Sequence, residues 1–258
     1  MRLMKRILSA AAVLALSASL LVGCSSGTAS SVPVSASSAA ESTVSSVEET
    51  ASSAVDENEA AAAQLLNDLT GSYQELWPVI LADEYKQTWL DDCTALVGED
   101  NAEAAFEKLS SMVTGDVYGE DAVKAYANGG GAYFCGFTNS LATLTFDGET
   151  STISGTDKDG NVLFSHTYHY IGMEPVHGLY EFESDDADSG EFTYFFLAPD
   201  TSAETYHIEF RYGSDADALS QYDAGDYAYW LASGISTDCD QTMIDNCIEL
   251  FCTENLAG

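Results

Sequence analysis

The spacing of hydrophobic residues changes at three consecutive glycines, 129–131. Before these glycines, apolar residues recur at intervals of three and four, which is typical of helices that bury one face. Pro78 interrupts the first of these stretches and is expected to break or kink the helix there. The pattern predicts helices over about 57–82, 101–112 and 121–126.

Beyond the glycines, apolar and polar residues alternate, which is typical of strands with one buried face. Asp147-Gly148 and Asp159-Gly160 stand where tight hairpin turns are expected. Short strands joined by tight turns favour an antiparallel meander that closes on itself, because open sheet edges are a liability. The predicted strands cover 133–138, 141–146, 150–154, 161–170, 178–184, 191–197 and 206–212.

The last part of the chain returns to helical spacing. Its apolar stripe consists of Met243, Ile244, Cys247, Ile248 and Phe251. Thr237 and Asp240 are expected to form a capping pair before this helix. The predicted fold class is mainly β: a small antiparallel β-barrel with flanking N- and C-terminal helices.

The N-terminal residues carry the features of a lipoprotein signal. Basic residues precede an apolar run over 7–22, which leads into Leu21-Val22-Gly23-Cys24, a sequence similar to a lipobox. The run is shorter than a membrane-spanning helix requires. We therefore expect residues 1–23 to be removed and Cys24 to be lipidated. The mature protein is then anchored to the outer face of a bacterial plasma membrane.

The composition divides the mature chain into a tether and one domain. Residues 24–60 are rich in Ser and Ala and cannot bury a core, so they predict a disordered tether. Residues 61–258 contain all three tryptophans and are numerous enough for one domain.

The chain is strongly acidic, with 42 Asp and Glu against eight Lys and Arg. Removal of the signal takes away Arg2, Lys5 and Arg6 but no acidic residue, which leaves a net charge of −37. Such a surface repels nucleic acid and anionic lipid, so we expect contact with the membrane only through the lipid anchor. It attracts cations, although acidity also serves solubility alone.

Five cysteines remain besides Cys24, and an odd number leaves at least one thiol free or paired between chains. No CxxC pair occurs, which argues against a zinc ribbon or a thioredoxin-type site. One or two disulfides suit an extracytoplasmic compartment, and the sequence leaves their pairing open. Motifs such as HExxH, GxSxG and Walker A are also missing from the sequence, so we do not expect an enzyme.

Two sets of residues are candidate metal ligands. His207 and Glu209 alternate on one strand and therefore point to the same face, about 7 Å apart. An imidazole and a carboxylate at this spacing can share a zinc ion, and Glu204 in the preceding loop is a third candidate. The alternative pair is His169 and His177, which hairpin pairing is expected to bring together.

The order of several motifs resembles the ZinT domain, a zinc-scavenging extracytoplasmic module with a lipocalin-like (calycin) barrel. Residues 69–81, Leu-Thr-Gly-Ser-Tyr-Gln-Glu-Leu-Trp-Pro-Val-Ile-Leu, are similar to its opening. Residues 165–172, 180–183 and 206–215 are similar to three of its strands, and Asp226-Tyr-Ala-Tyr-Trp follows in the same order. The resemblance spans about 69–250 and implies a calycin barrel.

The family holds zinc with three histidines, one upstream and two in a His-x-His pair. The second member of that pair falls on His207, whereas the first falls on Thr205 and the upstream histidine falls near Phe195 or Phe196. The resemblance thus implies zinc as the bound metal, with His207 as the one retained family ligand.

Two functions follow from these observations. The first is a surface-tethered lipoprotein that binds zinc or another divalent cation, for uptake by a metal transporter. The second is a metal-free calycin barrel that binds a small apolar ligand or a partner protein. Convergence of His207, Glu209 and Glu204 favours the first, and an apolar cavity in their place favours the second.

Overall fold

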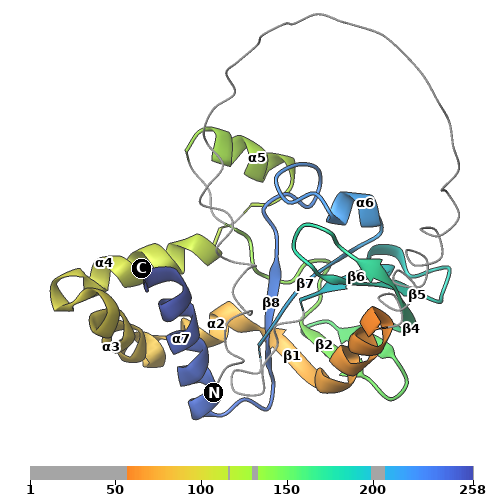
Figure 1. The fold of residues 1–258 in the computed structure, drawn as a ribbon, viewed down its shortest axis with the longest axis horizontal. Coiled ribbons are helices and arrows are strands. Elements are labelled where there is room, and N and C mark those ends of the chain that lie inside the picture. Colours follow the sequence, from red (N-terminus) through yellow and green to blue (C-terminus); the bar gives the residue numbers. More distant parts are fainter. Residues whose placement is uncertain (1–56, 116, 130–132, 199–206, 258) are drawn as a thin grey trace, which may run out of the picture.

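Eight antiparallel strands close into a barrel in which every strand pairs with its neighbours in sequence and β1 returns to β8 (Figure 1). The computed structural model describes residues 57–257 apart from 116, 130–132 and 199–206. The strands are β1 (Gly71–Glu75), β2 (Thr143–Asp147), β3 (Thr152–Thr156), β4 (Val162–Met173), β5 (Tyr180–Ser184), β6 (Tyr194–Leu197), β7 (His207–Gly213) and β8 (Ala232–Ser236). A closed barrel with helices before and after it confirms the predicted fold class.

The first strand corrects the helix predicted over 57–82. Residues 57–68 are helical, but the chain then forms β1, and α2 (Leu76–Ile80) begins only afterwards. Gly71 adopts a φ of 143°, which a residue with a side chain rarely takes, so the helix cannot continue through it. Tyr73 of β1 is buried and lies opposite Leu144 on one side and Ser236 on the other. Pairing with two strands therefore overrides the helical spacing.

The strand predicted over 133–138 is also wrong. Phe134 forms only isolated bridges, with Thr114 and Trp230. The barrel is instead completed by β8, whose sequence Ala-Ser-Gly-Ile-Ser gave no strand signal because it contains a single strong β-former.

Aromatic side chains fill the interior of the barrel. Phe195, Phe210 and Tyr212 are fully buried, and the rings of Phe195 and Tyr212 lie 5.4 Å apart between centroids. The helix of residues 57–68 adds leucine side chains to the same core. The interior is thus a packed core rather than an open cup.

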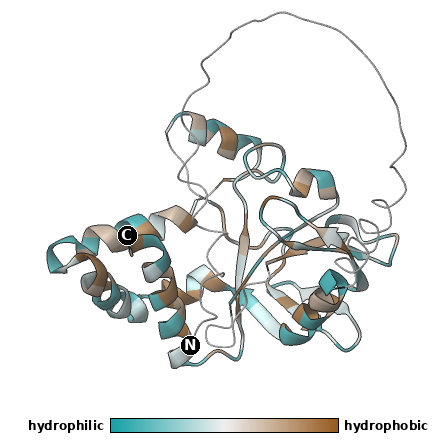
Figure 2. Ribbon diagram, viewed as in Figure 1, coloured by the Kyte–Doolittle hydropathy of each residue, from teal (hydrophilic) through white to brown (hydrophobic). Residues whose placement is uncertain are grey.

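Helices beside the barrel form a second core, which we call the helical lobe (Figures 1 and 2). Trp89, Leu109 and Ile248 are fully buried in it, and Ile235 of β8 joins it from the barrel. The lobe consists of α2, α3 (Lys86–Val97), α4 (Glu99–Val113) and α7 (Gln241–Leu256). Of these, α4 and α7 were predicted, and α3 was not.

Besides the helix of residues 57–68, the described residues form two α-helices outside the lobe: α5 (Glu120–Ala127), which was predicted, and the short α6 (Ala216–Leu219). Asp240 caps α7 as predicted, because its carboxylate accepts a hydrogen bond from the backbone N–H of Met243 at 3.0 Å. Thr237 takes no part in the cap: its N–H donates to the carbonyl of Ser72 in β1. In the described part of the chain, no helix has the length and apolar character needed to cross a membrane.

The segment predicted to contain the signal, the lipidated Cys24 and most of the tether lies outside the described residues. Residues 57–60, which the prediction assigned to the end of the tether, already belong to the helix of 57–68.

Candidate metal site on strand β7

Strand β7 has one apolar face, which belongs to the barrel core, and one polar face. Ile208, Phe210 and Tyr212 belong to the barrel core, so His207, Glu209 and Arg211 share the opposite face. His207 and Glu209 are half-buried, whereas Arg211 is fully buried. The structure thus confirms that His207 and Glu209 lie on one face, as the alternation predicts. The structure also places Arg211 on this face.

A cysteine thiol lies close to the Glu209 carboxylate. Glu209 is opposite Ser233 in the neighbouring strand, whose N–H donates to the carbonyl of Cys135 at 3.0 Å. Burial raises the pKa of the Cys135 thiol to about 12, and the negative charge of Glu209 contributes to this rise. The thiol is therefore protonated at neutral pH. No sequence motif indicated this neighbour, because Cys135 and Glu209 are far apart along the chain.

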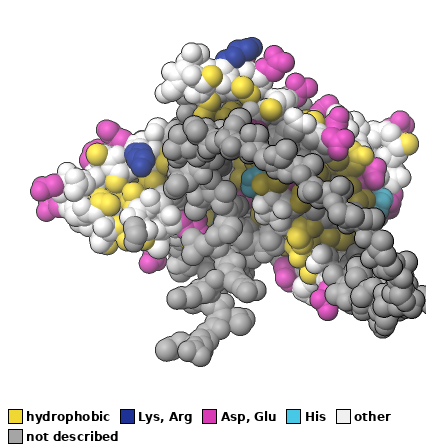
Figure 3. Space-filling view, turned by 45° about the horizontal axis from the view of Figure 1, so that its top comes forward, with side chains coloured by type: hydrophobic (Ala, Val, Ile, Leu, Met, Phe, Trp, Pro, Cys, Tyr) yellow, Lys and Arg dark blue, Asp and Glu magenta, His cyan; other side chains and the backbone are white. Residues whose placement is uncertain are grey.

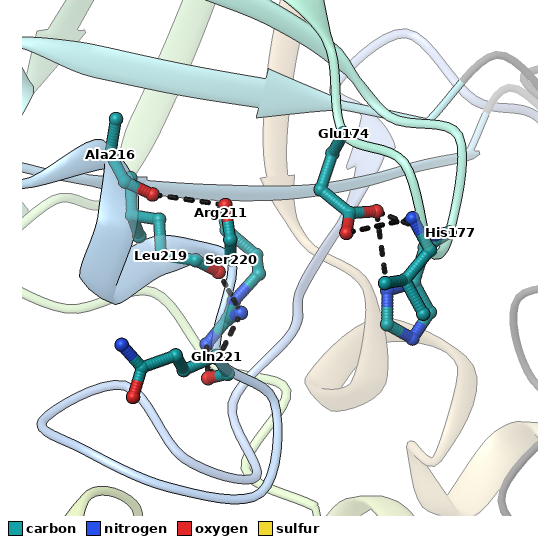
Figure 4. Close-up of polar contacts among 8 residues, drawn as sticks. Glu174, His177, Arg211, Ala216, Leu219, Ser220 and Gln221 are labelled. Carbon is teal, nitrogen blue, oxygen red and sulfur yellow. Dashed lines mark hydrogen bonds and ion pairs between the residues drawn. The ribbon is translucent and has the colours of Figure 1, made fainter. Parts of the chain in front are cut away.

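The turn after β4 holds a buried carboxylate. Glu174 is 1% exposed, and its oxygens accept hydrogen bonds from the backbone N–H groups of Val176 and His177 at 3.0 and 2.5 Å (Figure 4). The Nδ1 atom of His177 lies 3.3 Å from Oε2 of Glu174. The Glu174 carboxylate therefore stabilises its own turn through these hydrogen bonds.

Arg211 fixes the loop that follows α6. Its guanidinium donates to the backbone carbonyls of Leu219 and Tyr227, and the carbonyl of Gln221 lies 3.4 Å from Nη2 (Figure 4). Burial lowers the pKa of Arg211, against a rise from Tyr222 and Glu174 among others. Carbonyl dipoles and nearby π-electrons thus stabilise a positive charge that has no ion-pair partner among the residues that the structure describes. Arg211 was not predicted as a functional residue; its place between Phe210 and Tyr212 in a predicted strand is the local feature that indicates a buried cation.

Tyr222 connects the turn of Glu174 with β7. Its ring contacts the ring of His177, with 3.7 Å between centroids. Burial raises the pKa of the Tyr222 phenol, Arg211 lowers it, and the carboxylates of Glu174 and Glu209 raise it further. Two carboxylates from distant parts of the sequence therefore act on one phenol, which the sequence analysis did not foresee.

The alternative histidine pair does not form. In the β4–β5 hairpin, His169 lies opposite Glu183, whereas His177 lies in the turn that begins after Met173. Met173 comes four positions after His169 along the strand, which places His169 about 13 Å from the start of that turn. His169 instead hydrogen-bonds Asp185, with 2.7 Å between Nδ1 and Oδ1. The expectation that hairpin pairing brings His169 to His177 is thus wrong. The two strands pair as far as Met173 and Tyr180, so His177 lies in the turn while His169 lies well inside β4.

Glu204, which was predicted to bind the metal ion together with His207 and Glu209, lies outside the described residues. Within the ranges that the structure describes, no group of three or more His, Cys, Asp or Glu side chains is arranged to hold a metal ion. The described residues thus supply one imidazole and one carboxylate on the same face of β7. Two donors of this kind bind zinc weakly, since zinc takes three or four protein ligands at its sites.

No family model and no curated protein matches this chain. Among solved structures, the chain is similar to the Zn(II)-bound ZinT-like domain of Streptococcus pneumoniae AdcA, with 14% identity and a TM-score of 0.45. This match covers 71% of this chain and 89% of that domain. A second similar structure is Zn(II)-bound AdcA from the same organism, with 12% identity and a TM-score of 0.43. That match covers 72% of this chain but only 35% of AdcA.

Proposed function

We propose that this protein is a lipid-anchored extracytoplasmic domain that binds a divalent cation, zinc first, on the polar face of β7. The observation that carries the proposal is the placement of His207 and Glu209, which the barrel core holds side by side on one half-buried face. Imidazole nitrogen and carboxylate oxygen are both zinc donors. The order of sequence motifs that resembles the ZinT family supports zinc over other cations.

The donor set suits reversible capture of a cation better than a permanent structural site. Structural zinc sites are closed by four protein ligands, whereas the described residues contribute two. In this proposal Glu204 supplies a third donor. The Cys135 thiol is a poor fourth donor at neutral pH, because it must first lose a proton whose pKa is about 12.

Charge around the site also bears on where a cation binds. Acidic side chains are spread around the visible face of the molecule, and Lys or Arg side chains are few (Figure 3). The buried Arg211 occupies the other end of the polar face of β7, and its charge repels a cation there. The cation is therefore expected at the His207 end of the strand.

The metal-free alternative is a barrel that binds either a small apolar ligand or a partner protein. A small apolar ligand inside the barrel is disfavoured, because buried aromatic rings in contact with one another fill the interior. A partner protein is favoured by exposed apolar side chains along β4 and at its turn, with Val162 70% and Val176 73% exposed. A metal-uptake transporter, as the predicted recipient of the cation, is one such partner.

Calorimetric titration of the detergent-solubilised full chain with zinc tests the metal proposal. We expect binding that is lost in His207→Ala and in Glu209→Gln. The matched control is His166→Ala, since His166 is paired with Asp186 on the loop beyond β5, with 2.7 Å between Nδ1 and Oδ2. Binding that survives His207→Ala, or no binding at millimolar zinc, contradicts the proposal. Circular dichroism confirms that each variant is folded.

The membrane anchor is tested separately. We expect the protein to be found with the membrane fraction of the producing bacterium, and Cys24→Ser to prevent this lipid-dependent attachment and signal processing. A Cys24→Ser protein that is still processed and extracted like the wild type contradicts the anchor, whatever the titration shows.

A further inference from the structure

Two cysteines meet in the core of the helical lobe. Cys93 of α3 and Cys252 of α7 are both fully buried, and their sulfur atoms lie 3.9 Å apart. The two helices pack against each other in the lobe (Figure 1). Both cysteines are free thiols in this structure, so the sulfurs are in van der Waals contact without a bond.

We propose that Cys93 and Cys252 form a disulfide bond that joins α3 to the C-terminal helix α7. A disulfide needs about 2.05 Å between the sulfurs, so each sulfur has to move by about 1 Å. Because the side chains already point at each other, a small rotation of each side chain supplies this movement, and the helices need not separate.

The surroundings of the two thiols offer them no other chemical role. Trp89, Leu109 and Ile248 lie in the same apolar core, and no metal-binding group of three side chains occurs in the described ranges. Burial raises the pKa of both thiols, which keeps them protonated and unreactive once the lobe has packed. The bond therefore has to form before packing is complete.

The position of Cys252 permits oxidation at that stage. It lies in α7, while Cys93 lies 159 residues earlier in α3. Until α7 docks on the lobe, the Cys252 thiol is open to solvent and to an oxidant. Docking of α7 then brings it to Cys93.

The oxidant is a disulfide, either a small molecule or a protein of the thiol–disulfide oxidoreductase class. One cysteine thiolate attacks the oxidant disulfide and releases one thiol. The second cysteine thiolate then attacks the mixed disulfide and releases the other. Two cysteine thiols lose two electrons and two protons, and the oxidant gains them as two thiols. An oxidising extracytoplasmic compartment, as the signal sequence predicts, provides this class of reagent.

The test is refolding of the full chain from denaturant in a mixture of reduced and oxidised glutathione. Free thiols are then alkylated in denaturant, and the protein is digested without reductant and analysed by mass spectrometry. We expect a linked peptide pair that contains Cys93 and Cys252, absent from Cys93→Ser and Cys252→Ser. Cys239→Ser, at a half-buried cysteine of the same lobe, is expected to retain it. Alkylation of both Cys93 and Cys252 in the refolded wild type overturns the proposal.

A second measurement uses no cysteine variant and so avoids those that fail to fold. Wild type refolded with oxidant is expected to unfold at a higher urea concentration than wild type refolded with reductant. Reductant added to the native oxidised protein is expected to leave the bond intact, because the sulfurs are buried, and to cleave it once the protein unfolds. Equal urea midpoints for the two preparations overturn the proposal. None of these outcomes depends on zinc binding.

Discussion

The guanidinium of Arg211 lies 4.1 Å from the centre of the Tyr222 ring, and within the described ranges it forms no ion pair with a carboxylate. The same ring contacts His177 from the turn after β4. The turn after β4, strand β7 and the loop after α6 are therefore held together by one buried cation, one phenol and one imidazole.

Replacing Arg211 with methionine is expected to lower the free energy of unfolding by about 3 kcal/mol, because the buried carbonyl of Leu219 and the partly buried carbonyl of Tyr227 lose their donor. Urea denaturation measures the loss. Lys158→Met removes one positive charge from an exposed turn and should change stability by no more than about 0.5 kcal/mol. Similar losses in both variants would show that charge, and not the carbonyl contacts, is what matters.

The cap of α7 gives a smaller effect. Asp240→Ala is expected to cost about 1 kcal/mol, because the N–H of Met243 loses its acceptor. Asp240→Asn keeps a side-chain oxygen and should retain most of the stability. Thermal denaturation followed by circular dichroism separates the two. An asparagine variant as unstable as the alanine variant would point to the lost charge instead.

Gly148 lies against the helix of residues 57–68. A methyl group on Gly148 would come within 2.4 Å of the Cα atom of Asn67, and backbone cannot yield as a side chain can. We expect Gly148→Ala to cost about 1–3 kcal/mol through overpacking. Gly172→Ala is the control, since its new methyl group lies 3.6 Å from the flexible end of Glu181. Equal unfolding midpoints for the two variants would mean that the helix of residues 57–68 does not pack tightly against Gly148.

Asp92 of α3 faces other carboxylates. Burial raises its pKa, and Glu249, Asp245 and Asp91 raise it further. Because the folded-state pKa exceeds the unfolded value, ionisation of Asp92 costs stability at neutral pH, and this cost disappears as the pH falls below both values. Asp92→Asn is therefore expected to stabilise the protein at pH 7, by about 0.5 kcal/mol after solvent screening.

The same variant should show no advantage in acid, where the wild-type carboxyl is protonated. Urea midpoints at both pH values, with and without salt, measure the difference. Glu107→Gln on the exposed side of α4 changes the net charge equally and should give no comparable gain. A gain of equal size in Glu107→Gln would assign the effect to overall charge.

Helices and strands were predicted correctly where their own residues carry a clear apolar pattern or a capping residue. The period-two alternation predicted the strands from β2 to β7, and Asp240 with the apolar stripe behind it predicted α7. The strands β1 and β8 were missed because neither has an alternating apolar run. Each is held as a strand by pairing on both edges, and one partner of each is the other, more than 150 residues away in sequence.

The same distinction applies to the candidate site. Alternation alone placed His207 and Glu209 on one face, because strand geometry decides this locally. The pairing of His169 with Glu183 depends on the register of the hairpin, and the sequence did not specify the register. The contacts of Arg211 with the loop after α6 depend on how that loop folds back, which no nearby residue pattern encodes.

The closure of the barrel by β1 and β8 also determines how the domain resists mechanical force. The helix of residues 57–68 leads directly into β1, which is hydrogen-bonded to β2 on one side and to β8 on the other. Tension on the N-terminal side of the chain therefore reaches a strand that is held along both edges. A pull along the direction of β1 loads the hydrogen bonds of both edges together in shear, so that they do not open one at a time. A force applied along the first strand is thus resisted by two neighbouring strands at once.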